Sequence, residues 1–78
     1  MPKALVLATV EPSSEDSVLN QLKHIGGVEE AYFSYGAYDV IAKIRSNTAE
    51  DLKELITKKI RTLQEIRATL TLLMIDEQ

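Results

Sequence analysis

The hydrophobic pattern of this chain switches between strand-like and helix-like periods in the order strand, helix, strand, strand, helix, strand. The strand-like runs cover residues 4–10, 28–35, 38–45 and 66–75, and the helix-like runs cover 14–25 and 48–63. This order is the split βαβ plan. We therefore predict an α+β, ferredoxin-like βαββαβ fold, with a four-stranded antiparallel sheet and both helices on one face.

Turn and cap residues mark the boundaries of these runs. Ser13 or Ser14 offers an N-cap to the first helix, and Gly26-Gly27 ends it. Thr48 and Asp51 have the spacing of a capping box at the start of the second helix. Gly36 predicts a short antiparallel hairpin between the two middle strands.

Right-handed crossovers place the first and third strands at the centre of the sheet, flanked by the fourth and the second. The helices cover one face only, yet Leu5 and Leu7 make the other side of the first strand apolar, and Ile41 and Leu73 interrupt what should be polar rows. Such a face is too apolar for a monomer. We expect a second subunit to cover it, sheet against sheet, and an aspartate at Leu7 or Leu73 to dissociate or unfold the assembly.

Length and composition narrow the class of protein. Residues 1–78 are enough for one small domain, whose core stabilises it by only ~3–5 kcal/mol unless disulfides, metals or oligomerisation help. Without cysteine, and with His24 as the only histidine, disulfides and structural zinc are excluded, so oligomerisation remains. We predict no metal and no cofactor.

Charge and hydropathy indicate the partners and the cellular location expected for such a domain. The net charge of −3 argues against nucleic acid as a partner, and the basic cluster 58–61 suits a solvated helix end. No apolar run approaches a membrane span and no signal-peptide pattern follows the N-terminus, so we expect a cytoplasmic protein without membrane contact.

All four aromatic residues fall within residues 32–38, and Asp39 follows directly. Gly36 allows an unusual turn dihedral, while tyrosines combine an apolar body with a hydrogen-bonding tip, so this hairpin is a candidate binding site. The alternative is that aromatic residues simply prefer strands and that Asp39 solvates the next strand. As Asp39 opens a strand, we expect its removal to leave the fold intact.

Catalytic motifs are scarce. The chain has no cysteine nucleophile and no phosphate-binding glycine loop, and His24 in the last turn of the first helix is the one candidate base. Thr69 and Thr71 point the same way on the last strand, which β-propensity alone also explains. We predict no catalytic residue and no enzyme activity.

Three stretches resemble the effector-binding module of the Lrp/AsnC (feast/famine) transcriptional regulators, also known as the RAM domain. They are residues 27–32, the hairpin turn 36–40 and the last-strand segment 66–71. The family shows glycine, two residues, then aspartate at the turn and a threonine-x-threonine pattern on the last strand, and both are present here. Glu65 stands where the family often has glycine.

The resemblance implies a homodimer with sheets packed face to face, and a higher ring such as an octamer, with an amino-acid effector between dimers. It implies a site formed by Tyr35, Gly36, Ala37, Tyr38, Asp39, Thr69 and Thr71. Turn amides suit the α-carboxylate of the effector and an aspartate suits its ammonium.

The chain shows no helix-turn-helix segment, so we expect no direct DNA binding. It would act alone as an amino-acid sensor, or join a full-length Lrp/AsnC-type regulator through the same interfaces. Two other classes share the fold plan. A cofactor-free monooxygenase needs a catalytic group between sheet and helices, where only His24 is a candidate. An ACT-like small-ligand sensor is expected to have glycine in the first strand-to-helix loop, which reads Glu11-Pro12-Ser13-Ser14 here.

Overall fold

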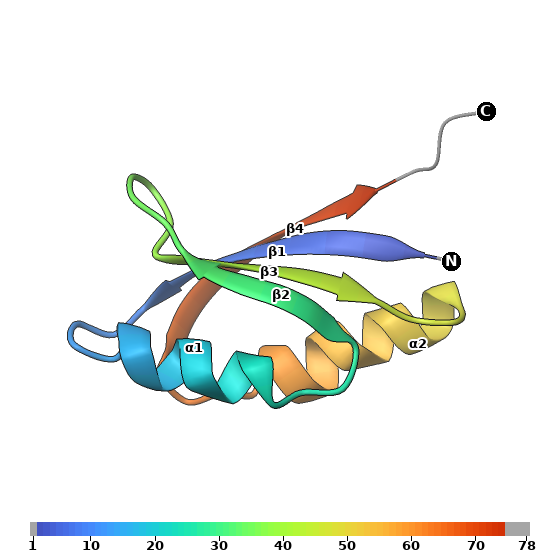
Figure 1. Cartoon of the computed structure of the whole chain (residues 1–78), viewed down its shortest axis with the longest axis horizontal. Helices are drawn as coiled ribbons and strands as arrows, with labels where there is room; N and C mark the ends of the chain where they lie inside the picture. Colours follow the sequence, from blue (N-terminus) through green and yellow to red (C-terminus); the bar gives the residue numbers. More distant parts are fainter. Residues whose placement is uncertain (1, 75–78) are drawn as a thin grey trace.

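Four strands and two helical segments form a two-layer α+β domain in this computed structural model, which describes residues 2–74 (Figure 1). The elements are β1 (Lys3–Val10), α1 (Glu15–Lys23), β2 (Val28–Phe33), β3 (Val40–Arg45), α2 (Ala49–Glu54) with its π-helical continuation η1 (Leu55–Ile60), and β4 (Ile66–Met74). The predicted fold class is thereby confirmed. The predicted last strand reached Ile75, which lies outside the described residues.

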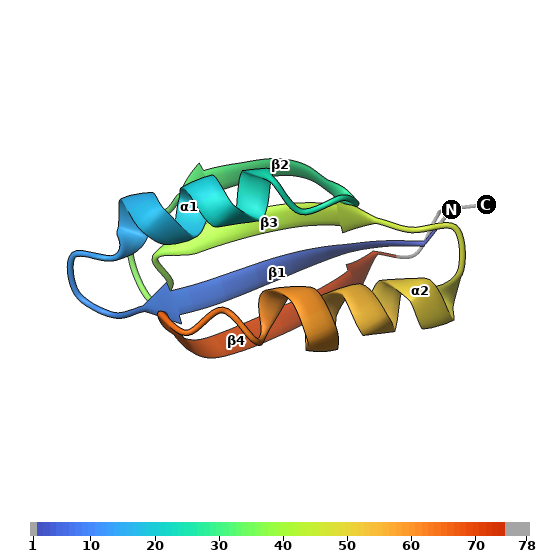
Figure 2. The ribbon, with the colours of Figure 1, turned by 90° about the horizontal axis from the view of Figure 1, so that it is seen from below.

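The sheet has the order β2-β3-β1-β4, and every neighbouring pair is antiparallel. This is the predicted order, with the first and third strands in the centre. Figure 2 shows both helices side by side on one face of the sheet, α1 over the β2–β3 side and α2 over the β1–β4 side. The opposite face carries no element of residues 2–74, and we call it the open face (Figure 1).

Alternation along β1 separates the two faces. Its even-numbered residues from Ala4 to Val10 are buried beneath the helices, while Lys3, Leu5 and Leu7 are half-buried on the open face. The register extends the open apolar row, because Leu7 pairs with Ile41 on β3 and with Leu70 on β4. The apolar second face predicted from the sequence is therefore present.

Leu73 does not lie on the open face, contrary to the sequence prediction. It pairs with Ala4, which lies under the helices, whereas Leu72 pairs with Leu5 on the open face. Strand periodicity gives alternation but does not by itself say which alternate row faces the core. A charge at Leu73 therefore tests the helix face and not the sheet-on-sheet interface.

The core between sheet and helices is built from aliphatic side chains only. Val18 and Leu22 of α1, and Ile56 and Ile60 of η1, pack against the buried rows of the strands. No polar or charged side chain is buried within residues 2–74. The interior that a cofactor-free enzyme of this plan would use therefore has no group for acid–base chemistry in the described part of the chain.

The cap predictions hold in part. Thr48 accepts a hydrogen bond from the Asp51 amide at 3.0 Å, as in a capping box. Ser14 is the N-cap of α1, but its side chain makes no capping bond. The second helix is not uniform, since it changes at Leu55 to π-helical bonding, seen in the 2.9 Å hydrogen bond from the Arg61 amide to the Ile56 carbonyl.

Candidate functional site

The hairpin between β2 and β3 is longer than predicted. The last strand pair is Phe33 with Val40, so residues 34–39 form a six-residue loop closed by a 2.8 Å hydrogen bond from the Ser34 amide to the Asp39 carbonyl. The loop rises from one end of the sheet, on the side away from the helices (Figure 1). Its backbone amides are thus presented outside the single-chain core.

Gly36 has φ +118°, a conformation that residues with a side chain rarely adopt. A Cβ atom at this position would meet nothing within 4 Å. The glycine is therefore required by the loop dihedral and not by lack of space.

Asp39 ties the hairpin to the central strand. Its carboxylate oxygen Oδ2 accepts a hydrogen bond from the Val10 amide at 2.9 Å, and its own amide donates to the Ala8 carbonyl at 2.9 Å. The pairing of β1 with β3 ends at Ala8 and Val40, so the Val10 amide lies beyond that ladder and bonds to the Asp39 side chain instead. Asp39 therefore has a structural contact that the sequence did not predict, while its second oxygen keeps its capacity to accept.

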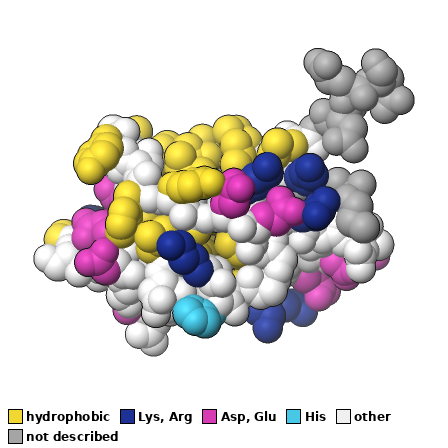
Figure 3. All heavy atoms as spheres, viewed as in Figure 1, with side chains coloured by type: hydrophobic (Ala, Val, Ile, Leu, Met, Phe, Trp, Pro, Cys, Tyr) yellow, Lys and Arg dark blue, Asp and Glu magenta, His cyan; other side chains and the backbone are white. Residues whose placement is uncertain are grey.

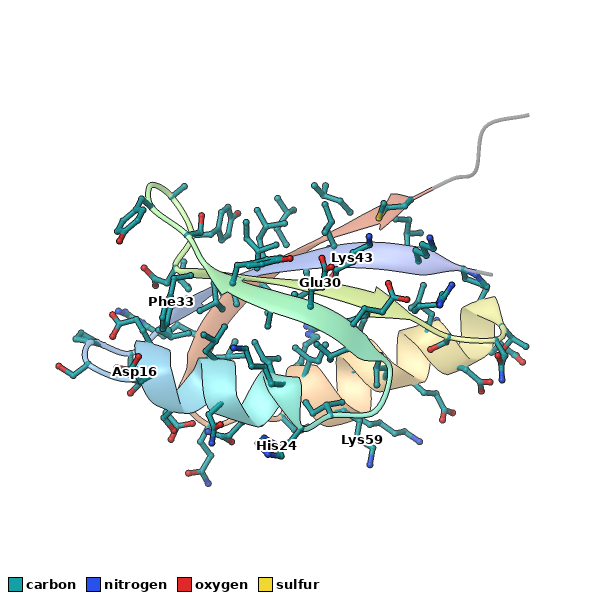
Figure 4. The ribbon with its side chains drawn as sticks, viewed as in Figure 1. Asp16, His24, Glu30, Phe33, Lys43 and Lys59 are labelled. Atoms are coloured by element: carbon teal, nitrogen blue, oxygen red, sulfur yellow. The ribbon has the colours of Figure 1, made fainter. Side chains whose placement is uncertain are left out.

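The aromatic residues of the hairpin do not form one cluster. Tyr32 pairs with Ile41 on the open face, and Phe33 lies toward α1 on the helix side of the sheet (Figure 4). Tyr35 at the loop tip is 99% exposed. A hydrogen bond to Glu30 raises the pKa of Tyr32, helped by the negative charge of that carboxylate. The rings of Tyr32, Phe33 and Tyr35 therefore lie on different sides of the molecule.

Thr69 and Thr71 both lie on the helix face, where they pair with Ala8 and Val6 of β1. Ala8 of β1 pairs with Thr69 on one side and with Val40, the neighbour of Asp39, on the other. Strand β1 therefore lies between Thr69 and the hairpin. The predicted site residues approach the same end of the sheet, but a single chain does not gather them around one cavity.

Residues 34–39 line none of four well-formed hollows on the surface of residues 2–74. The largest of these four has a volume of about 620 Å³ and lies between α2–η1 and β4. Its walls include Thr71 and Leu73 together with Lys53 and Arg61. The sequence did not predict this groove, because a four-residue spacing such as that of Lys53, Thr57 and Arg61 drifts around an ordinary α-helix and aligns only where the helix is wider.

The other candidate groups are remote from both features. His24 is exposed, and its Nδ1 donates to the Asn20 carbonyl at 2.8 Å, away from the sheet (Figure 4). Within residues 2–74 there is no group of three or more histidine, cysteine or carboxylate side chains able to hold a metal. In that same range, no helix has the length and apolar character needed to cross a membrane.

Relatives of known structure share this architecture. The crystal structure of FFRP-DM1 superposes with a TM-score of 0.93 at 39% identity, covering 96% of this chain and 100% of that one. The Neisseria meningitidis transcriptional regulator NMB0573, solved as a complex with L-Met, superposes with a TM-score of 0.86 over 97% of this chain and 51% of that one. At 6% identity, that second likeness shows the fold alone.

Curated relatives are regulators longer than this chain. The regulatory protein AsnC of Escherichia coli K12 is 32% identical over 59 residues, which are 76% of this chain and 39% of that protein. A Pyrococcus furiosus HTH-type transcriptional regulator is 29% identical over 72 residues, 88% of this chain and 48% of that protein. The chain thus spans half or less of the length of these two relatives.

The family model of the Lrp/AsnC ligand binding domain matches residues 3–77, nearly the whole chain. This match favours the Lrp/AsnC resemblance over the ACT-like alternative. The chain belongs to the Lrp/AsnC ligand-binding domain family, and it is a regulatory ligand-binding module of that family.

Proposed function

We propose that this domain binds a free α-amino acid at the β2–β3 hairpin, in a site that is completed only when subunits assemble. The observation that carries the proposal is the hairpin itself. Asp39 anchors the loop to β1, yet Tyr35 at its tip is 99% exposed and the loop lines none of the four hollows described above. A loop that is anchored at its base and faces outward is suited to contact a neighbouring subunit and a ligand between them.

Assembly begins, in this proposal, with a second copy on the open face. Exposed apolar side chains run across that face, over β1 and β4 (Figure 3). Leu70 and Leu72 are 43% and 46% exposed, and both contact the row that continues through Leu7 and Leu5. A two-fold dimer buries the same patch on both subunits, so one apolar face is sufficient to form it. Ring formation from such dimers, as in an octamer, is part of the same proposal.

The hairpin offers complementary groups for a zwitterion. Loop amides held by Gly36 at positive φ can donate to the α-carboxylate, as backbone nests do for anions. The Asp39 oxygen that is not bonded to Val10 can accept from the ammonium. Tyr38 and Ala37 complete the loop wall, and Thr69 and Thr71 of a neighbouring subunit supply hydroxyls. The match to the family model of the Lrp/AsnC ligand binding domain supports a small ligand for this module.

The biological role follows from these two steps. The domain works as a sensor whose assembly responds to an amino acid, alone or by mixed assembly with a full-length Lrp/AsnC-type regulator. Its formal charge of −3 supports regulation through such partners and not through DNA contacts of its own. The wholly aliphatic core supports binding over catalysis. A cytoplasmic location is part of this proposal.

The test is calorimetric titration of the twenty amino acids into wild-type protein and the Asp39→Asn variant, with light scattering for the mass. Asparagine keeps an oxygen for the Val10 amide but removes the charge, so binding should weaken about ten- to a hundredfold while the fold is kept and its stability falls only slightly. The variant Thr69→Val with Thr71→Val shows whether the hydroxyls contribute. Equal binding to wild type and Asp39→Asn would place the amino acid elsewhere.

A further inference from the structure

The groove between α2–η1 and β4 has an apolar floor. Leu52 and Ile56 reach it from the helix, and Leu73 and Met74 reach it from the strand. Leu73 is 68% exposed on the helix face of the sheet, which leaves a large aliphatic surface uncovered inside a hollow of about 620 Å³. This volume is within the range of ~300–1,000 Å³ that small-molecule sites occupy.

The charged residues around this floor all have the same sign. Lys53 and Arg61 line the groove from the helix, and Lys3 borders its end from β1, although its position in the strand alternates toward the open face. No aspartate or glutamate is among the described residues that line the groove. The ion pairs within residues 2–74 join Glu29 to Arg45, Glu54 to Lys58 and Glu11 to Arg67, so they do not include these three cations. Three cations around one apolar groove stand out in a chain whose net charge is −3.

The π-helical segment explains how the cations align. In an α-helix a four-residue step turns about 40° beyond a full turn, so a row with that spacing drifts around the helix. The Arg61 amide instead bonds to the Ile56 carbonyl, five residues back, and the wider turn offsets this drift. Lys53, Thr57 and Arg61 consequently all line the same groove. The Thr57 hydroxyl donates back to the Lys53 carbonyl at 3.0 Å and does not compete for a ligand.

We infer that this groove is a second binding site, which takes a carboxylate attached to an apolar chain, such as a medium-chain fatty acid. The carboxylate contacts Lys53 and Arg61, and the alkyl chain covers Leu52, Ile56 and Leu73. A zwitterionic amino acid is disfavoured, because the lining residues within 2–74 include no acidic side chain that can pair with its ammonium. The inference goes beyond the hairpin proposal and does not depend on it.

The probe is octanoate, titrated into isotopically labelled protein and followed through backbone amide resonances, with octanol and octylamine as ligands of matched chain length. Octanoate should produce saturable shifts at Lys53, Thr57 and Leu73. Octanol should bind several-fold more weakly, and octylamine should not bind the groove. The double variant Lys53→Gln with Arg61→Gln should weaken octanoate about tenfold, from roughly two- to fivefold for each exposed ion pair.

The matched control is Lys59→Gln, which removes a cation from η1 that points away from the sheet (Figure 4) and should leave octanoate binding unchanged. Leu73→Asn tests the apolar floor and should also weaken binding. Three results would overturn the inference: no saturation, equal binding of octanoate and octanol, or shifts centred on Leu5 and Leu70 of the open face. Shifts at the groove that depend on protein concentration alone would assign it to a second copy instead. Repeating the titration with Asp39→Asn separates this site from the hairpin.

Discussion

The Asp39 carboxylate accepts a hydrogen bond from the Val10 amide across a separation of 29 residues. The contact joins the end of the hairpin to the end of the central strand, at the point where the β1–β4 register shifts. Any substitution of Asp39 therefore tests two properties together, the loop anchor and the proposed ligand contact. Two variants can distinguish them.

Asp39→Ala should lower the free energy of unfolding by about 1–2 kcal/mol, because the partly buried Val10 amide loses its partner. Asp39→Asn should lower it by less than half as much, since the amide oxygen can still accept. Urea denaturation of both variants measures the difference. Equal stability of Asp39→Ala and wild type would show that water replaces the carboxylate without loss.

Leu70→Asp should dissociate the assembly, because it puts a charge on the open face that a second copy is proposed to cover. Leu73→Asp is the matched control, since Leu73 lies on the other face and is 68% exposed. Light scattering at micromolar concentration should give the monomer mass for the first variant and the wild-type mass for the second. The reverse pattern would mean that the helix face forms the interface.

Gly27→Ala should destabilise the fold by about 2–3 kcal/mol. Gly27 has φ +98°, and a Cβ atom there would lie 3.0 Å from a Leu55 methyl carbon and 3.1 Å from the Arg45 carbonyl oxygen. Gly26→Ala is the control, because its Cβ would meet nothing within 4 Å and its φ is not positive. It should change the stability by less than about 0.5 kcal/mol. Thermal unfolding of both variants provides the comparison.

Ser13→Gly should stabilise the domain by about 0.5–1 kcal/mol. Ser13 has φ +69°, and the Ser14 amide bonds to the Glu11 carbonyl at 3.0 Å, so residues 11–14 form a turn with Pro12 at its second position. Such a type II turn favours glycine third, and removing the left-handed strain outweighs the added flexibility of the unfolded chain. Ser13→Val should lower the melting temperature instead, and a Ser13→Gly melting temperature below wild type would contradict the turn assignment.

Glu30→Gln should lower the pKa of Tyr32, because the carboxylate holds the phenol in its neutral form. Because the pKa of Tyr32 is raised in the folded state, the direction in which pH changes the stability also follows. The unfolded chain loses this proton at a lower pH than the folded one, so the contribution to stability is complete below the ordinary tyrosine pKa and is lost as pH rises through the folded value. Titration of the Tyr32 ring resonances in wild type and in Glu30→Gln measures the two pKa values. Identical titrations would exclude the Glu30 contact.

The sequence predicts the fold because local patterns and topology rules agree. Period-two runs, the Thr48 cap and right-handed crossovers together leave one strand order. The details that decide the site are non-local and escape this reasoning. The face of Leu73 depends on its pairing with Ala4, and the role of Asp39 depends on where the pairing of β1 with β3 ends. The π-helical turn at 55–60 likewise depends on packing between layers, which helical periodicity does not encode.

Strand β4 places leucine and threonine rows on opposite sides of one edge strand, with Leu70 and Leu72 outward and Thr69 and Thr71 beneath α2–η1. Deleting one residue inside this strand exchanges the two rows over every position that follows. Hydroxyls would then enter the open face, while leucines would fill the groove. A deletion in the turn before β4, near Gln64, does not change the order of residues within the strand. The turn can shorten, so β4 can keep its pairing with β1 and both rows can stay on their own faces. Length variation among relatives that keep both surfaces should therefore concentrate in that turn and be excluded from β4.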